Sequence, residues 1–539
     1  MMTPDDLERL EQQLFDRRGS LLSLWQTLAD NFYPSMADFT IQRTEGDEFL
    51  ENMTTSYPII ARRELGDTLT SMLRPRGQEW FTLRADREER ETTEALQWME
   101  WATQTQRRAM YDPLSGFARA TKQGDHDFAT FGQTPISVEL SVDRSRFLYR
   151  HWHLRDVAWI EGADLKISHV GRKWQPTALD LAKTFPGKVH PEVTACIEQK
   201  KEPFKKFKCI HFVVPNDEKG QQPYRSIHYD CENKHVMEDV PSWSRVYVIP
   251  RWQTVTGSPY AHSPAAVAAL PDARLIQAIT LTLLDAGEMY AAPPMLAVQG
   301  AIRSDIDLRS RGITWVDREY DERSGEPLRP LSQDARGYPV GAELREEARS
   351  MIADAFFLSK LQLPPADGRE MTAYEVGQRV QEFIRTTMPL FEPIEADYNA
   401  ALCDATFDLG MRNGLFGPLD AIPESLRRAE VRFVFKSPLS DAVERQKSSQ
   451  FMETANMLAM ASQVDPTASL QINLPEAVRD ALQAVAPAAW MRSEDEYQQA
   501  ATERAEQEAM AQQIQGVDNL ASVATNVGGA ADALQSVPA

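Results

Sequence analysis

The first part of the chain has the hydrophobic spacing of helices. Apolar side chains recur every three or four positions, which places them on one helix face: Leu7, Leu10, Leu14, Leu21 and Leu24. Thr3 can cap this helix, and Pro4 suits its first turn. The pattern predicts helices at residues 3–32, 56–74, 90–110 and 113–130.

The pattern then changes to alternation. Residues 134–142 and 147–152 are rich in β-branched and aromatic side chains, which predicts two strands joined by a turn. Short strands are expected to continue over 155–175. Residues 177–199 are predicted to form two short helical pieces, because Pro186 and Pro191 interrupt them.

Residues 203–250 are predicted to be mostly strand. Three short runs, FKCIHFVVP, YRSIHYD and SRVYVIP, are separated by polar segments at 216–222 and 231–238 that are typical of turns. The pattern indicates a small β module inserted between helices.

A long helix is predicted next. Ser263 can cap it and Pro264 occupies its first position. Apolar residues follow at helical spacing: Leu275, Ile276, Ile279, Leu283, Ala286 and Tyr290. Twenty such residues form a rod of about 30 Å, and Pro293 and Pro294 end it.

The remaining part is also mainly helical. Short strands and turns at 296–331 lead into a polar loop, Gln333–Tyr338, and a helix at 341–361. A helix interrupted by prolines covers 371–413, and VRFVF at 431–435 predicts a strand. Residues 441–515 are rich in Ala, Gln and Glu and predict helices, whereas 516–539 predict a mobile tail. The fold class predicted is α+β, mainly α-helical.

Composition narrows the class of protein. The 539 residues are 42% hydrophobic and 25% charged, which is typical of a globular chain of three or four structural units. The net charge of −21 disfavours a protein that grips DNA phosphates over a basic face, but it suits a wall past which DNA slides. No uncharged apolar run of about 18 residues occurs, so no membrane span is expected.

Motifs for catalysis or metal binding are missing. The four cysteines, Cys196, Cys209, Cys231 and Cys403, form no C-x-x-C pair, and a reducing compartment is expected. The sequence contains no Walker A loop, no G-x-S-x-G and no H-E-x-x-H. The chain is therefore predicted not to be an enzyme and to need no cofactor.

Two sets of residues invite a metal-site interpretation. His151 and His153, with His126, could bind a metal, but no carboxylate or cysteine partner is evident, so ordinary structural histidines are favoured. Asp305 and Asp307 could belong to a two-metal nuclease, but arginines flank them on both sides. A salt-bridged turn is favoured there, and no metal is expected.

Several segments resemble a known family. PRWQTVTGSPYAHSPAAVAALPDARLIQAI, from residue 250, MTAYEVGQRVQEF, from residue 371, NGLFGP, from residue 413, and FGQTPISVE, from residue 131, occur in this order. They resemble segments of podovirus (T7-like) head-to-tail connecting proteins, a bacteriophage portal protein family. The match departs at His262, where that family usually has Gly, and over the last 90 residues.

The resemblance implies a portal fold with a wing, a two-helix stem, an inserted β-rich clip and a helical crown. On this basis 1–176 form the N-terminal wing, 177–199 the first stem helix region, 200–250 the clip and 251–295 the second stem helix. Residues 296–370 would hold wing strands, the tunnel loop and the following helix, and 371–440 a long kinked wing helix and a strand. The crown is expected at 441–515 and the flexible tail at 516–539.

The resemblance also implies a function. Portal subunits form a ring of about twelve copies with an axial channel for genome packaging and ejection. The expected partners are further copies, double-stranded DNA in the channel, terminase, tail or adaptor proteins, and major capsid and scaffolding proteins, with no membrane. The expected place is the capsid vertex of the virion, after synthesis in the host cytoplasm. The alternatives are another ring-forming adaptor or tail protein and a phage-assembly enzyme.

Two candidate sites follow from this interpretation. A tunnel loop is expected to face DNA through Gln333, Asp334, Arg336 and Tyr338, with an exposed hairpin turn as the alternative. A basic patch on the clip is expected to contact terminase, tail proteins or DNA through Lys200, Lys201, Lys205, Lys206 and Lys208. The alternative for the patch is a strand edge that lysines protect from aggregation.

Overall fold

The computed structural model describes residues 2–297, 328–330, 337–361 and 394–435, with a few single residues after 453. Within these ranges it leaves out 42, 45, 49, 51–52, 88–89, 142, 217–221, 292, 294 and 428–429. The chain divides into two compact units. One contains Met1–Gln78 and Arg108–Asn413, and the other contains Glu79–Arg107 and Gly414–Ala539.

The first unit begins with α1 (Pro4–Phe15) and α2 (Gly19–Phe32). A capping box starts α1, in which Thr3 and Asp6 satisfy each other's backbone N–H groups. The single helix predicted at 3–32 is interrupted by a 3₁₀ turn at Asp16–Arg18. The buried Arg18 donates to the carbonyls of Leu154 and Val157, and these tertiary bonds fix the break.

Three further helices support this unit. α3 (Tyr57–Leu73) and α5 (Phe117–Phe131) pack against each other, and α12 (Ala401–Arg412) follows a π-helical turn at Glu395–Ala400. A three-stranded antiparallel sheet in the order β3-β2-β9 lies beside them, from Phe147–His151, Ile136–Leu140 and Tyr247–Val248. A short pair, β10 (Gln253–Thr254) and β11 (Ala261–His262), leads towards the long helix.

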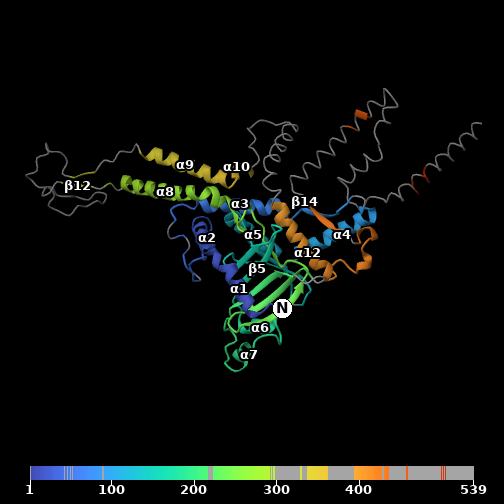
Figure 1. Cartoon of the computed structure of the whole chain (residues 1–539). Helices are drawn as coiled ribbons and strands as arrows, with labels where there is room; N and C mark the ends of the chain where they lie inside the picture. Colours follow the sequence, from blue (N-terminus) through green and yellow to red (C-terminus); the bar gives the residue numbers. More distant parts are fainter. Residues whose placement is uncertain are drawn as a thin grey trace, which may run out of the picture. The chain divides into compact units, whose positions relative to one another are not determined.

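The largest sheet has five antiparallel strands in chain order, β4-β5-β6-β7-β8. They span Val157–Glu161, Ile167–Trp174, Cys209–Pro215, Tyr224–Asp230 and His235–Ser242. α1 covers one face, where Leu7, Leu10 and Leu14 pack on apolar strand residues. α6 (Ala178–Thr184) and α7 (Pro191–Glu198) pack against Phe207, Cys209 and Met237 in a second core (Figure 1).

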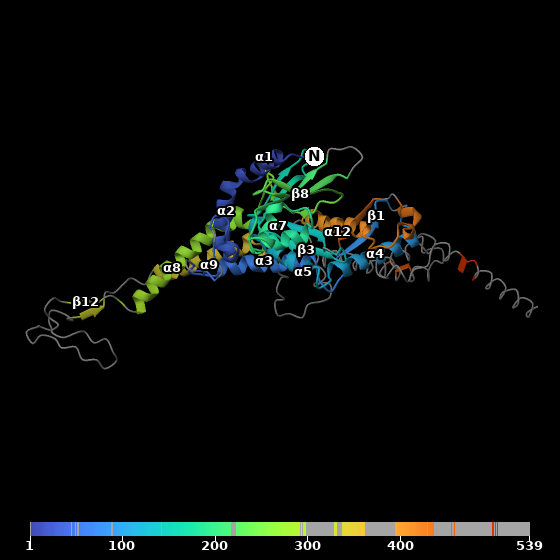
Figure 2. The ribbon, with the colours of Figure 1, turned by 90° about the horizontal axis from the view of Figure 1, so that it is seen from below.

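A helix hairpin extends from the first unit. A π-helical turn at Ala265–Ala269 leads into α8 (Leu270–Ala291), and α9 (Gly337–Ala355) runs beside α8 in both views (Figures 1 and 2). Between them, β12 (Met295–Ala297) pairs with β13 (Leu328–Pro330) in antiparallel register. A short α10 (Leu358–Leu361) follows after Phe357, whose backbone φ of 57° ends the regular helix.

The second unit holds β1 (Phe81–Ala85), α4 (Thr93–Met110) and β14 (Val431–Phe435). β1 and β14 pair antiparallel, with Phe81 opposite Phe435. Trp98, Trp101 and Phe416 form an aromatic cluster beside two 3₁₀ turns, Leu419–Ala421 and Glu424–Leu426.

The predicted α+β class is confirmed. The two short helices at 177–199 are present, and so is the strand at 431–435. Besides the break in the first helix, a second element differs: residues 235–242 form β8 where a turn was predicted at 231–238, because β7 supplies a partner for their backbone. β4 and β5 share one sheet with β6, β7 and β8, so the proposed boundary between wing and clip falls inside that sheet. The crown and tail at 441–539 lie almost wholly outside the described residues.

Candidate assembly interface and basic segment

The two helices of the hairpin are antiparallel and close together. Tyr290 near the end of α8 meets Tyr338 at the start of α9, with ring centroids 6.5 Å apart. A Cβ at Gly341 would lie 2.8 Å from Leu283 Cδ2, so glycine at this position permits the close approach. The hairpin is thus a defined pair and not two independent helices.

The first turn of the long helix is held by the loop after α5. The Ser263 hydroxyl donates to the Thr130 carbonyl at 2.6 Å and accepts from the Ala266 N–H at 3.0 Å. Gly132 has a φ of +75°, and a Cβ there would lie 2.7 Å from the carbonyl carbon of His262. The backbones at Gly132 and His262 therefore approach as closely as glycine allows. This contact fixes the place from which α8 starts.

A second attachment lies one third of the way along α8. The Gln277 side-chain oxygen accepts the backbone N–H groups of Thr54 and Thr55 at 2.8 and 3.0 Å. Its amide nitrogen donates to the Thr55 carbonyl at 2.8 Å. The Gln277 side-chain amide thus supplies hydrogen-bond partners to the backbone of Thr54 and Thr55. These two residues are not helical and lie more than 200 positions away in sequence.

Much of the hairpin surface is apolar and exposed. On α9, Val340, Leu344 and Met351 are spaced by four and seven residues and share one helix face. On and before α8 the exposed apolar side chains are Val267, Leu275, Leu281, Leu284, Met289 and Tyr290. Exposed apolar side chains that are contiguous usually mark an interaction surface.

The length and composition of this helix are themselves notable. Among the described residues, Ala265–Ala291 is the one helix long and apolar enough to cross a membrane by those two criteria alone. Its most apolar 18-residue window has a mean hydropathy of 1.4, and 17% of that window is buried. Charged residues nevertheless punctuate it at Asp272, Arg274, Asp285 and Glu288.

The five lysines of the predicted basic patch lie on one extended segment between α7 and β6. This segment closes the α6–α7 layer: Lys206 bridges Thr177, and the Lys205 carbonyl accepts the Ala178 N–H at 2.9 Å. Phe207 is buried, and the Lys205 ammonium lies 5.1 Å from its ring centroid. The structure therefore packs this lysine-rich stretch of chain against the start of α6.

The patch has an apolar centre. Phe204 is 75% exposed, between the lysine pairs on either side of it in sequence. Lys200 is bound to Glu192 at 2.6 Å, which raises the pKa of Lys200. Lys201 adopts a left-handed backbone conformation with a φ of 53°, and the Lys208 carbonyl accepts the Cys231 N–H at 3.0 Å.

Of the predicted tunnel loop, the structure describes Tyr338. Gln333, Asp334 and Arg336 lie outside the described residues. Tyr338 belongs to the first turn of α9, where it is 45% exposed and contacts Tyr290. Asp305 and Asp307 also lie outside the described residues.

The histidines considered as metal ligands have carboxylate partners that the sequence did not reveal. His151 Nε2 lies 2.9 Å from Asp127, and His153 Nε2 lies 2.9 Å from Asp38. Burial and the nearby Arg62 lower the pKa of His126. In the part of the chain that the structure describes, no group of three or more His, Cys, Asp or Glu side chains is placed to hold a metal ion.

A buried ion pair joins the helices beneath the hairpin. Arg74 at the end of α3 pairs with Asp125 of α5, and both side chains are almost fully buried. Arg74 Nη1 also donates to Asn399 Oδ1 at 2.6 Å, which attaches the π-helical turn before α12. The short motif Asp125–His126–Asp127 was the available sequence signal, since charged residues seldom occur on the buried face of a helix.

A cavity of about 480 Å³ lies between this turn, α12 and the end of the five-stranded sheet. Asp397, Asp404 and Asp408 line one side, and Trp243 and Tyr224 line another. Burial, with the neighbouring Asp408, raises the pKa of Asp404 to about 6.

The described residues thus form an α+β chain with a helix pair whose apolar side chains are exposed. The model of the bacteriophage head to tail connecting protein family matches residues 5–489, and the chain belongs to this family. The predicted family and the predicted function of a portal subunit are thereby confirmed. The family is a structural one and not an enzyme family.

Solved structures with a similar arrangement come from gene transfer agent (GTA) particles. A chain of the native GTA virion is 11% identical, with a TM-score of 0.35, over 79% of this chain and 94% of that chain. A chain of the native GTA neck, computed with C12 symmetry, is 11% identical, with a TM-score of 0.34, over 74% and 85%. A chain of the empty-particle neck, computed with C6 symmetry, is 10% identical, with a TM-score of 0.35, over 74% and 86%. No curated protein sequence matches this chain.

Proposed function

We propose that copies of this chain close into a ring by packing their α8–α9 hairpins side by side around an axial channel for the genome. The observation that carries the proposal is the exposed apolar surface of the hairpin. Burying apolar surface contributes about 25 cal/mol per Å², so a face with this many exposed Leu, Val and Met side chains favours association. Membership of the head-to-tail connecting protein family supports a ring at the junction of head and tail.

The contact in such a ring is heterologous. A cyclic assembly with more than two copies joins one face of each subunit to a different face of the next. The hairpin offers two faces: the Val340–Leu344–Met351 stripe of α9 and the Leu281 and Leu284 side of α8. In the proposed ring the stripe of one copy meets the α8 face of its neighbour.

This proposal places the stem differently from the sequence-based expectation. α6 and α7 are 7 and 8 residues long and cover the five-stranded sheet, so 177–199 are poorly suited to be a stem helix. α9 is the helix that runs beside α8. The two-helix stem would then be α8 with α9, and the segment joined by β12 and β13 would take the place of the clip.

The charge of the chain suits a channel. With a net charge of −21, the subunit as a whole repels phosphate, and DNA in the lumen would move without tight binding. Within this proposal Gln333, Asp334, Arg336 and Tyr338 remain the candidates for a DNA-facing loop. The lysine segment with its exposed Phe204 remains the candidate contact for terminase or tail proteins. The capsid vertex remains the proposed site, with capsid and scaffolding proteins as neighbours.

Electron microscopy with native mass spectrometry of the purified full chain tests the ring. The wild type should form rings with an axial hole. Leu284→Glu and Leu344→Glu should each give soluble, folded monomers, because a carboxylate cannot be buried cheaply in an apolar contact. Leu165→Glu is the matched control: Leu165 is 72% exposed but lies outside the hairpin, so rings should persist. Rings formed by both hairpin variants would refute this interface.

A second experiment addresses the loop. Arg336→Glu should leave rings intact but weaken DNA packaging or retention in an in vitro packaging assay, because it adds a negative charge where phosphate passes. Unchanged packaging and retention would remove Arg336 from the candidate residues without affecting the ring proposal.

A further inference from the structure

A row of polar side chains crosses the middle of the five-stranded sheet. Arg172 of β5 is registered opposite His211 of β6, which is registered opposite His228 of β7. Directly paired residues of antiparallel strands point to the same face. The rings of His211 and His228 stack, with centroids 4.0 Å apart and planes inclined by 5°. Such a row inside a sheet layer needs a partner for every polar atom.

Both ring nitrogens of His211 have a hydroxyl partner. Arg172 Nε can only donate, so the Tyr247 oxygen accepts its hydrogen at 2.7 Å. The Tyr247 oxygen also lies 2.7 Å from His211 Nδ1, and His211 Nε2 lies 2.8 Å from Ser226 Oγ. Burial and the neighbouring His228 and Arg172 hold the pKa of His211 well below its usual value, so the ring is neutral at pH 7. Arg172 is the one charge of this row.

Three buried nitrogens beside this chain of bonds lack a partner among the described residues. They are Arg172 Nη1, Trp174 Nε1 and His228 Nδ1. The Arg172 guanidinium carbon lies 5.1 Å from the Trp174 ring centroid, and the Trp174 and His228 rings are 6.4 Å apart. All three nitrogens can donate a hydrogen bond, the His228 nitrogen as the Nδ1–H tautomer.

Arg172 also lacks a counter-charge. Arg172 is 4% exposed, and no carboxylate of the described residues forms an ion pair with its guanidinium. The Trp152 ring lies 3.8 Å from the guanidinium carbon and gives it a cation–π contact. This contact does not neutralise the positive charge, and a buried charge without a counter-ion is unfavourable.

Two carboxylates of the same sheet are engaged with other groups. Asp230 is buried, but it accepts the backbone N–H groups of Glu232 and Asn233 and so holds the turn after β7. Glu238, which is registered opposite His228, is bound to Lys188 at 2.7 Å. A water molecule would accept one or two of the orphan hydrogens but would leave the positive charge unbalanced.

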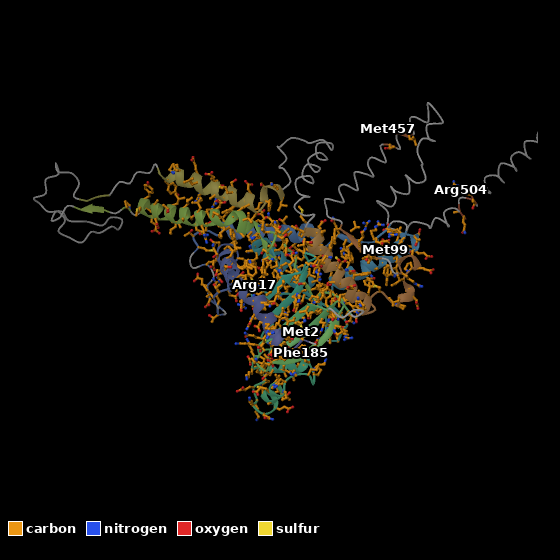
Figure 3. All side chains as sticks on the ribbon, in the orientation of Figure 1. Met2, Arg17, Met99, Phe185, Met457 and Arg504 are labelled. Atoms are coloured by element: carbon orange, nitrogen blue, oxygen red, sulfur yellow. The ribbon has the colours of Figure 1, made fainter. Side chains whose placement is uncertain are left out.

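We propose that Arg172, Trp174 and His228 form a binding site for one small monovalent anion, of the size of chloride or formate. Three N–H donors and a single buried positive charge match such an anion in number and in sign. Phe185, labelled in Figure 3, closes the site from the end of α6, with its ring 4.8 Å from that of His228. The anion would connect β5 and β7 beneath the α6–α7 layer. This site is independent of the ring proposal.

Thermal unfolding of the full chain in different sodium salts tests the site. At equal ionic strength, chloride and formate should raise the midpoint by several degrees over gluconate, which is too large to enter, since an anion bound only to the folded state stabilises it. Trp174→Phe keeps the ring and removes the donor, so it should lose most of this increment. Trp243→Phe, at an exposed tryptophan, should keep the full increment. Equal midpoints of the wild type in all three salts would overturn the proposal.

A direct measurement covers the case in which Trp174→Phe does not fold. The wild-type chain crystallised in bromide should show an anomalous peak within hydrogen-bond distance of Arg172 Nη1. An ordered water there in both bromide and gluconate would overturn the proposal, as would a side-chain carboxylate from another segment or copy.

Discussion

The five-stranded sheet and the α8–α9 hairpin bury their side chains in opposite ways. In the sheet, Phe212 and Ile227 are buried under α1, and even its polar row lies inside. In the hairpin, leucines such as Leu281 and Leu284 face outward. The sheet module completes its own core within one chain, whereas the hairpin leaves apolar surface exposed. A substitution of the same kind should therefore reduce folding stability in one region and assembly in the other.

The largest effect on folding is expected from truncating the sheet core. Phe212→Ala should lower the free energy of unfolding by about 3–5 kcal/mol, because it removes a fully buried aromatic ring beneath α1. Leu284→Ala, on the exposed side of α8, should change it by no more than about 0.5 kcal/mol. Denaturant unfolding at concentrations where the chain is monomeric measures both. Similar losses for the two variants would remove the contrast between sheet and hairpin.

The next effect concerns the place where the hairpin starts. Gly132→Ala should cost about 1–3 kcal/mol, because it combines a left-handed backbone with a Cβ pressed against the backbone of His262. Gly187→Ala is a suitable control, with a φ of +73° but nothing within 4 Å of the added carbon. Both can be compared by denaturant unfolding. The difference between Gly132→Ala and Gly187→Ala in the loss of unfolding free energy measures the backbone contact. If the two losses are equal, the contact is dispensable.

A comparable or smaller loss is expected at the second attachment of α8. Gln277→Leu leaves the N–H groups of Thr54 and Thr55 without their acceptor, which costs about 1–2 kcal/mol. Hydrogen exchange should show faster exchange at these two amides, with α1 unchanged. Thr282→Leu, whose hydroxyl bonds only within α8 in the described structure, is the control. Unchanged protection at Thr54 and Thr55 would contradict the attachment.

The smallest effect at neutral pH, and a growing one in acid, is expected in the polar row. Burial and the nearby Arg172 lower the pKa of His228 to about 3. Because the unfolded chain binds this proton near pH 6.5, the stability that neutral His228 contributes is present above pH 6.5 and is lost as the pH falls towards 3. His228→Phe should reduce the slope of stability against pH in this window by about 1.4 kcal/mol per pH unit. An unchanged slope would show that His228 is already protonated in the folded chain.

Local sequence patterns predicted the elements well but not their partners. The helices near 57–73, 93–110 and 117–131 follow from apolar spacing and caps. β8 escaped prediction because HVMEDVPS has polar residues and a proline, and it is a strand through its pairing with β7. The partner of α8 could not be read from local patterns either, since nothing in the spacing of 337–355 indicates which helix α9 contacts.

The candidate sites divide in the same way. The lysine segment is contiguous, so its sequence already placed the five charges together. The bonds that position the hairpin join residues far apart, such as Gln277 with Thr54 and Arg74 with Asn399. Arg172, Trp174 and His228 have nitrogens without a partner among the described residues, and this depends on strand register and on what covers the sheet. The spacing of hydrophobic residues along the sequence reveals neither these long-range bonds nor the strand register.

The pairing of β1 with β14 has a consequence for the order of synthesis. β1 ends at residue 85 and its partner begins at residue 431, so a ribosome adds roughly 350 residues between the two. At about 5–20 residues per second, the first strand waits some 20–70 s for its neighbour. During this interval Trp80 and Phe81, which are buried in the finished chain, have no β14 to cover them. The second unit can close only near the end of translation, which makes it the part of the subunit most dependent on protection while the chain is still being made.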